Sequence, residues 1–375
     1  MARLSLLLAV ALLPAATLLE AQDPRLARLN EYLAAAASRG HVQGSVLVAE
    51  GGTALIDTAF GYADMELRVP NTPETRFRVA SLTKQFTAMA VMILAEDGKL
   101  RIADPISRWL DSIPPEWSAI TIHDLLRHTS GISDYEEWFG GWRTQAYSDY
   151  MAQDSAPWRI ARDAKQKPLD FQPGTKFHYS NSAYILLGFI IERAAGMPYE
   201  EFLRTRVHEP LGMTHSSQDH SDELLPNRAQ GYRLRPGTWP DGYNDGLEPD
   251  EYLNAHYQLM QAPQADAGLV TTARDLYRWD QALYGEELVS REMVDSMFTP
   301  GLGDYGYGWF VRRGPDGVTH EHSAGLPGFT CYIMRIPASR RTIIVLGNLE
   351  HLGSTVRDLA AIMRGDPVTF PDPEP

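Results

Sequence analysis

Residues 77–98 read FRVASLTKQFTAMAVMILAEDG, and the interpretation of the whole chain starts from this stretch. Apolar residues recur at helical spacing from Leu82 to Leu94, and Gly98 follows them as a typical helix stop. The pattern predicts a helix over 82–97 with Ser81 at or near its N-terminus. Lys84 lies three residues after Ser81, so both side chains share one helix face and can reach each other.

This spacing suits nucleophilic catalysis. A serine hydroxyl becomes a good nucleophile when a neighbouring base takes its proton. Lys84 can be that base if burial and nearby cations lower its pKa. The helix N-terminus would favour negative charge on the Ser81 oxygen. The same residues also fit a capping serine followed by a solvated lysine, so the pair needs support from elsewhere in the chain.

A second candidate element is Tyr179-Ser180-Asn181, which precedes a helix predicted over 182–195. In an extended segment Tyr179 and Asn181 project to the same side. A phenol beside a buried lysine can shuttle protons, and an amide can bind both a lysine and a substrate carbonyl. The alternative interpretation is that Tyr179 packs and Asn181 caps the following helix.

The third candidate element reads HEHSAG at residues 320–325. It lies on a predicted strand, where His320 and His322 share a face. A cationic or hydrogen-bonding side chain there could hold a substrate carboxylate or carbonyl. A metal site formed by these histidines with His215 or His220 is the competing interpretation. No H-E-x-x-H motif supports it, so we expect no metal.

The three elements come with four further stretches: HTSG at 128–131, EPLGM at 209–213, TTARDL at 271–276 and GLPGF at 325–329. Taken in order, these motifs resemble the serine β-lactamase and penicillin-binding protein superfamily over residues 25–362. The Tyr-x-Asn form is similar to that of class C β-lactamases and their relatives. Those relatives include family VIII esterases, D-stereospecific aminopeptidases and D-Ala-D-Ala carboxypeptidases.

The resemblance implies an acyl-enzyme mechanism. Ser81 would be the acylated nucleophile, while Lys84 and Tyr179 would share proton transfer, with the identity of the base left open. The backbone N–H groups of Ser81 and Gly325 would form the oxyanion hole. No cofactor and no metal are implied. The implied substrate-binding residues are Asn181, His322 and Gly325.

Two positions depart from the pattern of the superfamily. Ala324 replaces the usual glycine of the third element, so an extra methyl lies where substrate is expected along the strand. His322 stands where class C β-lactamases carry lysine, which weakens the case for a dedicated β-lactamase. No G-x-S-x-G motif is present, so the α/β-hydrolase route to an esterase is absent.

Strand-like runs lie at both ends of the chain, and helical patterns fill the middle. The predicted strands are 45–49, 54–60, 307–311, 318–322, 330–336 and 342–346. The helices expected besides those above are 24–39, 121–128, 272–284 and 353–364. The economical fold is α/β (α+β): an antiparallel sheet built from both ends, flanked by helices, with an inserted mostly helical domain, as the resemblance also implies.

We therefore expect a sheet domain from residues 22–75 and 265–366, a helical domain from 76–264 and a flexible tail at 367–375. Residues 214–262 are rich in polar residues, proline and glycine and show weak periodicity. They form either a functional loop near the site or a tolerated surface insertion.

Residues 1–21 have the pattern of a signal peptide, with Arg3, an apolar run from Leu4 to Leu13 and Ala21 before the expected cut. A membrane anchor is the alternative, but the run is shorter than the ~20 residues that span a bilayer. We expect export to the periplasm or the medium, with no stable membrane span afterwards. The net charge of −14 argues against nucleic acid as a partner, and the single Cys331 excludes an intrachain disulfide.

The favoured function is an exported serine hydrolase acting on an ester or amide, with a small ester, a D-amino peptide or a β-lactam as substrate. A non-catalytic peptide-binding protein of the same fold is the alternative. Intact Ser81, Lys84 and Tyr179 argue against it, because a ligand-holding relative has little reason to keep all three. A zinc-dependent hydrolase using the histidines is a third hypothesis. Oligomeric state is not indicated by the sequence.

Overall fold

The computed structural model of the 375-residue chain describes residues 23–153, 157–234, 252–352 and 354–370. The predicted signal peptide, residues 371–375 of the predicted tail and residues 235–251 of the predicted loop lie outside the described residues. Within the described ranges, no helix is both long and apolar enough to cross a membrane.

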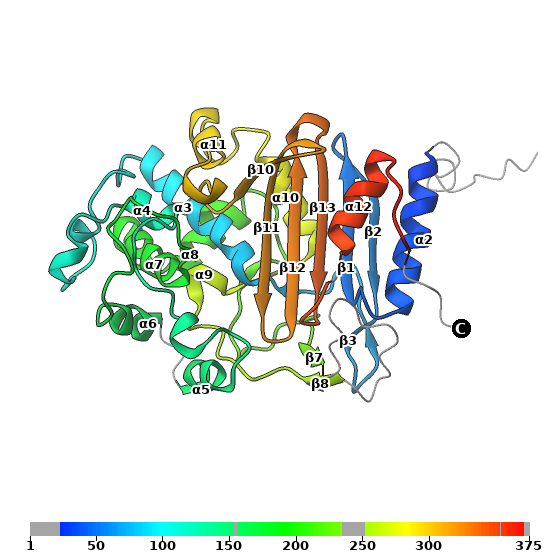
Figure 1. The fold of residues 1–375 in the computed structure, drawn as a ribbon, viewed down its shortest axis with the longest axis horizontal. Helices are drawn as coiled ribbons and strands as arrows, with labels where there is room; N and C mark the ends of the chain where they lie inside the picture. The colour runs from blue at the N-terminus through cyan, green and yellow to red at the C-terminus, as the bar shows by residue number, and fades with distance from the viewer. Residues whose placement is uncertain (1–22, 154–156, 235–251, 353, 371–375) are drawn as a thin grey trace, which may run out of the picture.

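A six-stranded antiparallel sheet forms the centre of the molecule, with the order β10-β11-β12-β13-β1-β2 (Figure 1). Strands from both ends of the chain meet where β1 pairs with β13, with Val46 opposite Val345. The predicted fold class is thereby confirmed. The strand bounds are β1 Gly44–Glu50, β2 Thr53–Phe60, β10 Phe310–Gly314, β11 Gly317–Leu326, β12 Phe329–Ile336 and β13 Arg341–Gly347.

The central strands are apolar on both faces because helices cover both. Along β1, Val46 and Val48 belong to one buried cluster, while Leu47 and Ala49 belong to the other. This alternation follows from the two-residue period of a strand. On the first face lie α2 (Pro24–Ser38) and α12 (Thr355–Arg364); on the second lies α10 (Ala273–Ala282).

The helical part of the molecule lies beside the sheet, and its centre is α3 (Thr83–Glu96). Every residue of α3 from Thr83 to Leu94 is buried, because α7 (Asn181–Ala195), α8 (Tyr199–Leu203), α9 (Gln264–Ala267) and α11 (Arg291–Met297) pack around it. The other helices of this part are α4 (Ile122–Leu126), α5 (Gln145–Gln153) and α6 (Pro157–Ala164).

Short strands connect the two parts. Strand β9 (Leu269–Thr271) pairs with β5 (Phe77–Arg78) on one side and β6 (Ser217–Gln218) on the other. The remaining two-stranded sheets are β3 (Tyr62–Asp64) with β4 (Val69–Pro70), and β7 (Tyr232–Leu234) with β8 (Tyr252–Asn254). The β5–β9 pairing ties the segment before Ser81 to the segment that follows α9.

One predicted strand is displaced. The prediction placed a strand over 307–311, whereas β10 begins at Phe310 and ends at Gly314. Gly308 has φ +77, and a Cβ there would lie 2.8 Å from the Gln85 Cα. The chain therefore turns tightly against α3 before the strand begins, and only glycine fits that turn.

Replacing Leu29 by alanine tests how much the cover of the first face contributes to stability. Leu29 is fully buried in the cluster between α2, α12 and the sheet. We expect Leu29→Ala to lower the free energy of unfolding by about 2–5 kcal/mol in chemical denaturation, because it leaves a cavity. Glu31→Ala, an exposed position on the same helix, is the control and should change it by less than about 0.5 kcal/mol. Equal effects of the two changes would contradict this account of the core.

Candidate active site

Ser81 lies on a strained turn that leads into α3. It is the middle residue of a short 3-10 turn, Ala80–Leu82, and α3 begins at Thr83. Ala80 has φ +46, a left-handed conformation that residues other than glycine rarely adopt. Such strain persists only where the surroundings enforce it. Here the neighbouring Val79 N–H donates to Leu269 O at 3.0 Å and holds the chain against β9.

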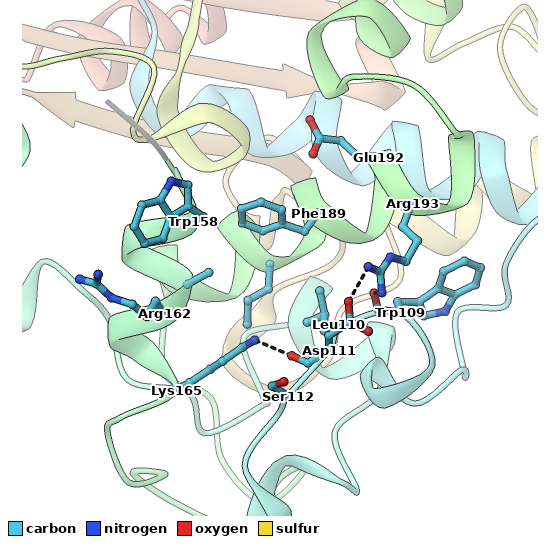
Figure 2. A pocket seen from close by; sticks show the side chains of 12 residues that line it. Trp109, Leu110, Asp111, Ser112, Trp158, Arg162, Lys165, Phe189, Glu192 and Arg193 are labelled. Atoms are coloured by element: carbon cyan, nitrogen blue, oxygen red, sulfur yellow. Dashed lines mark hydrogen bonds and ion pairs between the residues drawn. The ribbon is translucent and has the colours of Figure 1, made fainter. Parts of the chain in front are cut away.

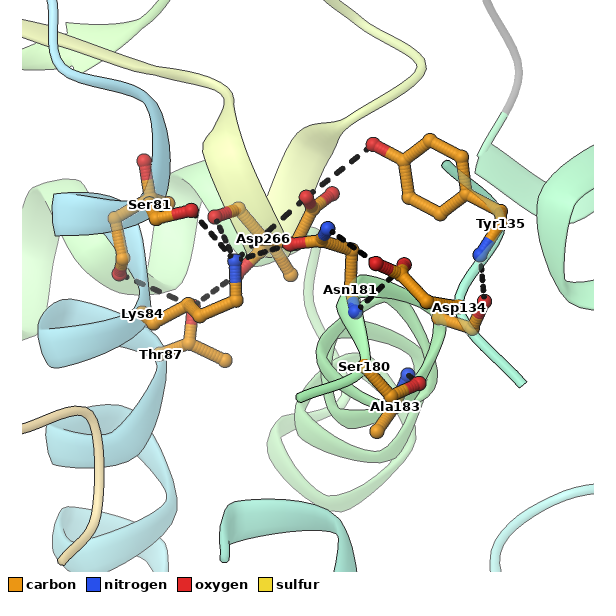
Figure 3. A network of polar contacts seen from close by, with 12 residues as sticks. Ser81, Lys84, Thr87, Asp134, Tyr135, Ser180, Asn181, Ala183 and Asp266 are labelled. Atoms are coloured by element: carbon orange, nitrogen blue, oxygen red, sulfur yellow. Dashed lines mark hydrogen bonds and ion pairs between the residues drawn. The ribbon is translucent and has the colours of Figure 1, made fainter. Parts of the chain in front are cut away.

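The amine of Lys84 is fully buried directly behind Ser81. Its Nζ donates to Ser81 Oγ at 3.1 Å, to Asn181 Oδ1 at 2.6 Å and to the Asp266 carbonyl at 3.0 Å (Figure 3). The ring of Tyr179 lies 4.9 Å from Nζ. Ser81 and Lys84 are therefore in contact, as the sequence predicted. Tyr179 and Asn181 of the second candidate element lie beside Lys84.

Burial lowers the pKa of Lys84, which favours the neutral amine. The prediction that nearby cations also lower this pKa is wrong. The charges around Lys84 are carboxylates instead, chiefly Asp266, with Glu136 and Asp134, and they act in the opposite direction by stabilising the ammonium form.

Tyr179 is held by its ring, and its hydroxyl lies beside Ser81. The ring packs on His128 with centroids 4.2 Å apart. Burial raises the pKa of Tyr179 well above its ordinary value, and the hydroxyl of Ser81 acts in the opposite direction. In the described part of the chain, no protein group makes a well-aligned hydrogen bond to Tyr179 Oη. The phenol therefore stays protonated near neutral pH.

Ser180, and not Asn181, caps α7. The Ser180 side chain accepts from the Ala183 N–H at 3.2 Å, so the alternative that Asn181 caps this helix is wrong. Asn181 is the first helical residue, and its amide is free to accept from Lys84. Asp134 fixes that amide, because Asn181 Nδ2 donates to Asp134 Oδ2 at 3.1 Å and Asn181 N–H donates to Asp134 Oδ1 at 3.0 Å.

The HTSG stretch supports the second element through His128. Its Nδ1 accepts from the Ser180 N–H at 3.0 Å, and burial lowers the pKa of His128 well below its ordinary value. A neutral ring that accepts at Nδ1 can also pack against the ring of Tyr179. His128 therefore positions the Tyr179–Asn181 segment.

Three carboxyl groups near Lys84 were missed by the sequence analysis: Asp134, Glu136 and Asp266. Burial raises the pKa of Asp134 to about 6 and that of Asp266 to about 7, and it raises that of Glu136 well above its ordinary value. Asp134 and Glu136 follow HTSG closely in the chain, which is a weak sequence signal for them. No sequence signal indicated Asp266, because only the tertiary fold brings α9 to α3.

His322 of β11 occupies the wall of the site in a neutral form. Tyr305 Oη donates to His322 Nε2 at 3.1 Å, and His322 Nδ1 donates to the Ser323 carbonyl at 2.6 Å. Burial, reinforced by Lys84, lowers the pKa of His322 to about 3. Of the two roles expected for this side chain, cationic or hydrogen-bonding, the cationic one does not fit a neutral ring whose two nitrogens have protein partners. His322 instead shapes the strand that leads to Gly325.

His320 does not join His322 in a shared site. Its ring stacks on Phe298 with centroids 3.9 Å apart, and Arg335 lies beside it. His215, one of the expected partners, is placed by its backbone N–H, which donates to Asp275. Among the described residues there is no group of three or more histidine, cysteine or acidic side chains that could hold a metal ion.

A cavity of about 450 Å³ opens in front of Ser81, between the helical part and β11. Trp142 closes one side of it, and a Cβ at Gly325 would lie 3.0 Å from the Trp142 ring. Lys84 lies behind this cavity, and none of the described residues of 214–262 lines it. The predicted site residues on its wall are Ser81, Tyr179, Asn181, His322 and Gly325, together with Ala324.

A second cavity, of about 630 Å³, shares no lining residue with the first. It lies between α6, α7 and the loop at 109–112 (Figure 2). Trp109, Trp158 and Phe189 form much of its wall. Lys165 also borders it, but its Nζ donates to the Asp111 carbonyl at 2.7 Å and the residue is only half-buried. The cavity therefore holds no buried amine beside a serine.

The molecule has the architecture of the serine β-lactamase and penicillin-binding protein superfamily, as the sequence motifs predicted. The shared features are the six-stranded sheet, the helical part beside it and the contact of Ser81 with Lys84. A family model described as Beta-lactamase matches residues 27–365, and the chain belongs to this family.

Among curated proteins, the chain is 33% identical over 345 residues to penicillin-binding protein 4* of Bacillus subtilis (strain 168), covering 88% of this chain and 73% of that protein. Among solved structures, it is similar to a penicillin-binding protein from Bacillus halodurans, with a TM-score of 0.72 and 28% identity over 86% of this chain and 95% of that chain.

Two enzymes share the fold at lower identity. The D-amino acid amidase from Ochrobactrum anthropi SV3 has a TM-score of 0.72 and 23% identity, covering 88% of this chain and 97% of that chain. EstCE1, a hydrolase with promiscuous acyltransferase activity, has a TM-score of 0.74 and 24% identity, covering 91% and 99%.

The protonation state of His322 can be measured directly. Since its pKa is lowered to about 3, we expect the ring to stay neutral, with hydrogen on Nδ1, from pH 8 down to pH 5. In the unfolded chain the ring takes a proton near pH 6.5. The neutral ring of His322 therefore stabilises the folded protein fully above about pH 6.5, and this stabilisation is lost as the pH falls towards about 3. Imidazole ¹⁵N NMR, assigned with His322→Gln, tests this, and a titration midpoint near 6.5 in the folded protein would contradict it.

Ala324→Gly tests the effect of the unusual methyl on the cavity wall. Ala324 lines the cavity with Ser81, so removing its methyl gives substrate more room along β11. We expect activity towards bulkier acyl groups to rise relative to small ones. The measurement is a size series of p-nitrophenyl esters, and unchanged relative rates across the series would count against the idea.

Proposed function

We propose that this protein is a serine hydrolase that forms an acyl-enzyme through Ser81 and cleaves an ester or an amide. The observation that carries the proposal is the 3.1 Å contact between Lys84 Nζ and Ser81 Oγ, with the amine fully buried and the serine on the wall of a cavity. This is the geometry in which a neutral amine can accept a proton from an attacking hydroxyl.

In the proposed first step, Ser81 Oγ attacks the carbonyl carbon of the substrate, and Lys84 takes the hydroxyl proton. The backbone N–H groups of Ser81 and Gly325 stabilise the oxygen that becomes negative. When the bond to the leaving group breaks, that group receives a proton relayed from Lys84 through Tyr179. Water then attacks the acyl-enzyme by the reverse path, releasing the acid and restoring Ser81.

The directions of the two pKa shifts favour Lys84 over Tyr179 as the base. Burial lowers the pKa of Lys84 and so raises the fraction of neutral amine. Burial raises the pKa of Tyr179, which keeps its phenol protonated and suited to relaying a proton. Tyr179 lies between the amine and the cavity, where a departing group would need that proton.

We propose a small ester or a D-amino peptide as substrate in preference to a β-lactam. The neutral His322 gives the cleft no cation at the position where class C β-lactamases carry lysine. A D-amino acid amidase and EstCE1, a hydrolase with promiscuous acyltransferase activity, have the same fold, which is consistent with the proposal. The non-catalytic peptide-binding alternative is left as an outcome of the test.

We also propose that the protein is exported to the periplasm or the medium. The support is the charged, apolar and small-residue pattern of residues 1–21. Purification from separated cell fractions, followed by N-terminal sequencing, would show a mature chain beginning near Gln22. A chain that keeps Met1 and stays inside the cell would overturn this proposal.

The proposed reaction is tested by hydrolysis of p-nitrophenyl esters, D-alanyl peptides and nitrocefin. We expect Ser81→Ala to abolish turnover. Lys84→Ala and Tyr179→Phe should each lower kcat/KM by ~10²-fold or more, the usual size of lost acid–base help. Activity in all variants should be unaffected by EDTA.

Ser112→Ala is the matched control, because Ser112 is an exposed serine beside Lys165 in the second cavity. It should retain full activity. Turnover that survives in Ser81→Ala, or near-normal rates in Lys84→Ala, would refute the assigned roles. Substrate binding without turnover, together with no reaction with serine-directed phosphonates, would favour the peptide-binding alternative, and loss of turnover in EDTA would favour a metal-dependent hydrolase.

A further inference from the structure

Asp266 of α9 contacts the amine of Lys84 through both its backbone and its side chain. Its backbone carbonyl accepts from Lys84 Nζ at 3.0 Å, and its carboxylate Oδ2 lies 3.8 Å from the same nitrogen (Figure 3). Both side chains are fully buried. Helix α9 packs against α3, α7 and the turn that carries Ser81, so this contact is built into the centre of the helical part.

The carboxylate of Asp266 has few other partners. Tyr135 Oη donates to Oδ2 at 3.3 Å, and Oδ1 has no hydrogen-bond partner among the described residues. Burying an unpaired carboxylate costs free energy. Whether this carboxylate is ionised therefore depends on the nearest cation. Among the described residues, this carboxylate forms an ion pair only with Lys84.

We propose that Asp266 is a positioning residue that acts through Lys84: its carbonyl places the amine behind Ser81, and its carboxylate is the counter-ion that sets how readily the amine gives up its proton. This inference rests on the proposed function, in which neutral Lys84 is the base. Asp266 itself touches no reacting atom.

Other charged and titratable groups also face this pair. From the loop before α5 come Asp134, Tyr135 and Glu136. The phenols of Tyr147, Tyr179, Tyr184 and Tyr199 and the imidazoles of His128 and His322 also face it. Asp266 has the largest effect of the three carboxylates on the pKa of Lys84. Asp134 differs from it because both of its carboxylate oxygens accept hydrogen bonds from Asn181.

The sign of the effect follows from the charges. Burial raises the pKa of Asp266 to about 7, so its carboxylate is present above that pH. There it stabilises the ammonium form of Lys84 and holds the pKa of Lys84 higher than burial alone would leave it. Removing the carboxylate takes that support away, and Lys84 loses its proton at lower pH. The neutral base then becomes available in more acidic solution.

The kinetic experiment measures the rate of Ser81 acylation against pH in the wild type and in Asp266→Asn, which keeps the backbone carbonyl and the size of the side chain. We expect the acidic limb of the profile to move to lower pH by about one unit or more, the usual effect of removing an opposite charge within about 4–6 Å. A residue with a purely structural role would lower the rate equally at every pH.

Three further variants complete this series. Asp266→Ala is a second way to remove the charge if the asparagine variant does not fold, because alanine suits a helix and leaves no unpaired amide. Asp266→Glu keeps the charge and should retain a limb close to that of the wild type. Asp280→Asn removes another fully buried carboxylate, which pairs with Arg335 at 2.8 Å, and should leave the limb in place.

A direct measurement separates this inference from the proposed function. The chain has five lysines, Lys84, Lys99, Lys165, Lys167 and Lys176, so ¹³Cε NMR of lysine-labelled protein can follow each one. Assignment by Lys84→Arg identifies the buried amine. We expect the titration midpoint of Lys84 to fall in Asp266→Asn and Asp266→Ala but not in Asp280→Asn.

The outcomes are distinct. A Lys84 midpoint unchanged by loss of the Asp266 charge overturns the inference, whether or not the protein is an enzyme. A wild type that is never acylated overturns the proposed function, and the NMR midpoint still decides whether Asp266 is the counter-ion. A shifted midpoint with an unshifted acidic limb overturns the link between Asp266 and catalysis.

Discussion

The burial of one amine, that of Lys84, is the constraint on which the rest of the site depends. A buried ammonium or amine is tolerated only when its hydrogens have acceptors. Lys84 meets this need with three of them, from the turn before α3, from α7 and from α9. Those segments are far apart in the chain, so satisfying one nitrogen fixes how the central helices pack.

The surrounding structure maintains this arrangement from several directions. The β5–β9 pairing holds the strained turn at Ala80, Ser180 caps α7 so that Asn181 can face Lys84, and His128 holds the same segment by its ring nitrogen. Strand β11 is hydrogen-bonded between β10 and β12 and forms the wall of the cavity opposite Ser81. The cavity is thus bounded by groups whose positions are set before any substrate arrives, which is what efficient stabilisation of a developing charge requires.

Much of this could be predicted from local sequence patterns, and the exceptions have physical causes. The helix after Ser81 and the sheet from both chain ends follow from apolar periodicity, which is a local property. The neutral state of His322 depends on Tyr305 and on burial, and the proximity of Asp266 depends on the packing of α9. Neither the protonation state of His322 nor the position of Asp266 can be predicted from the spacing of residues in the sequence. The strand predicted over 307–311 begins later, at Phe310, because Gly308 approaches α3 closely, which is a tertiary contact.

The most direct test of the central claim is to locate the covalent intermediate. The protein is mixed with an activated ester, quenched in acid during turnover, digested and mapped by peptide mass spectrometry. The account predicts an added acyl mass on the peptide that contains Ser81, assigned to that side chain and absent when Lys84 is replaced by alanine on the same time scale. An acyl group found on another residue, or steady turnover with no acyl-protein at any time, would contradict it.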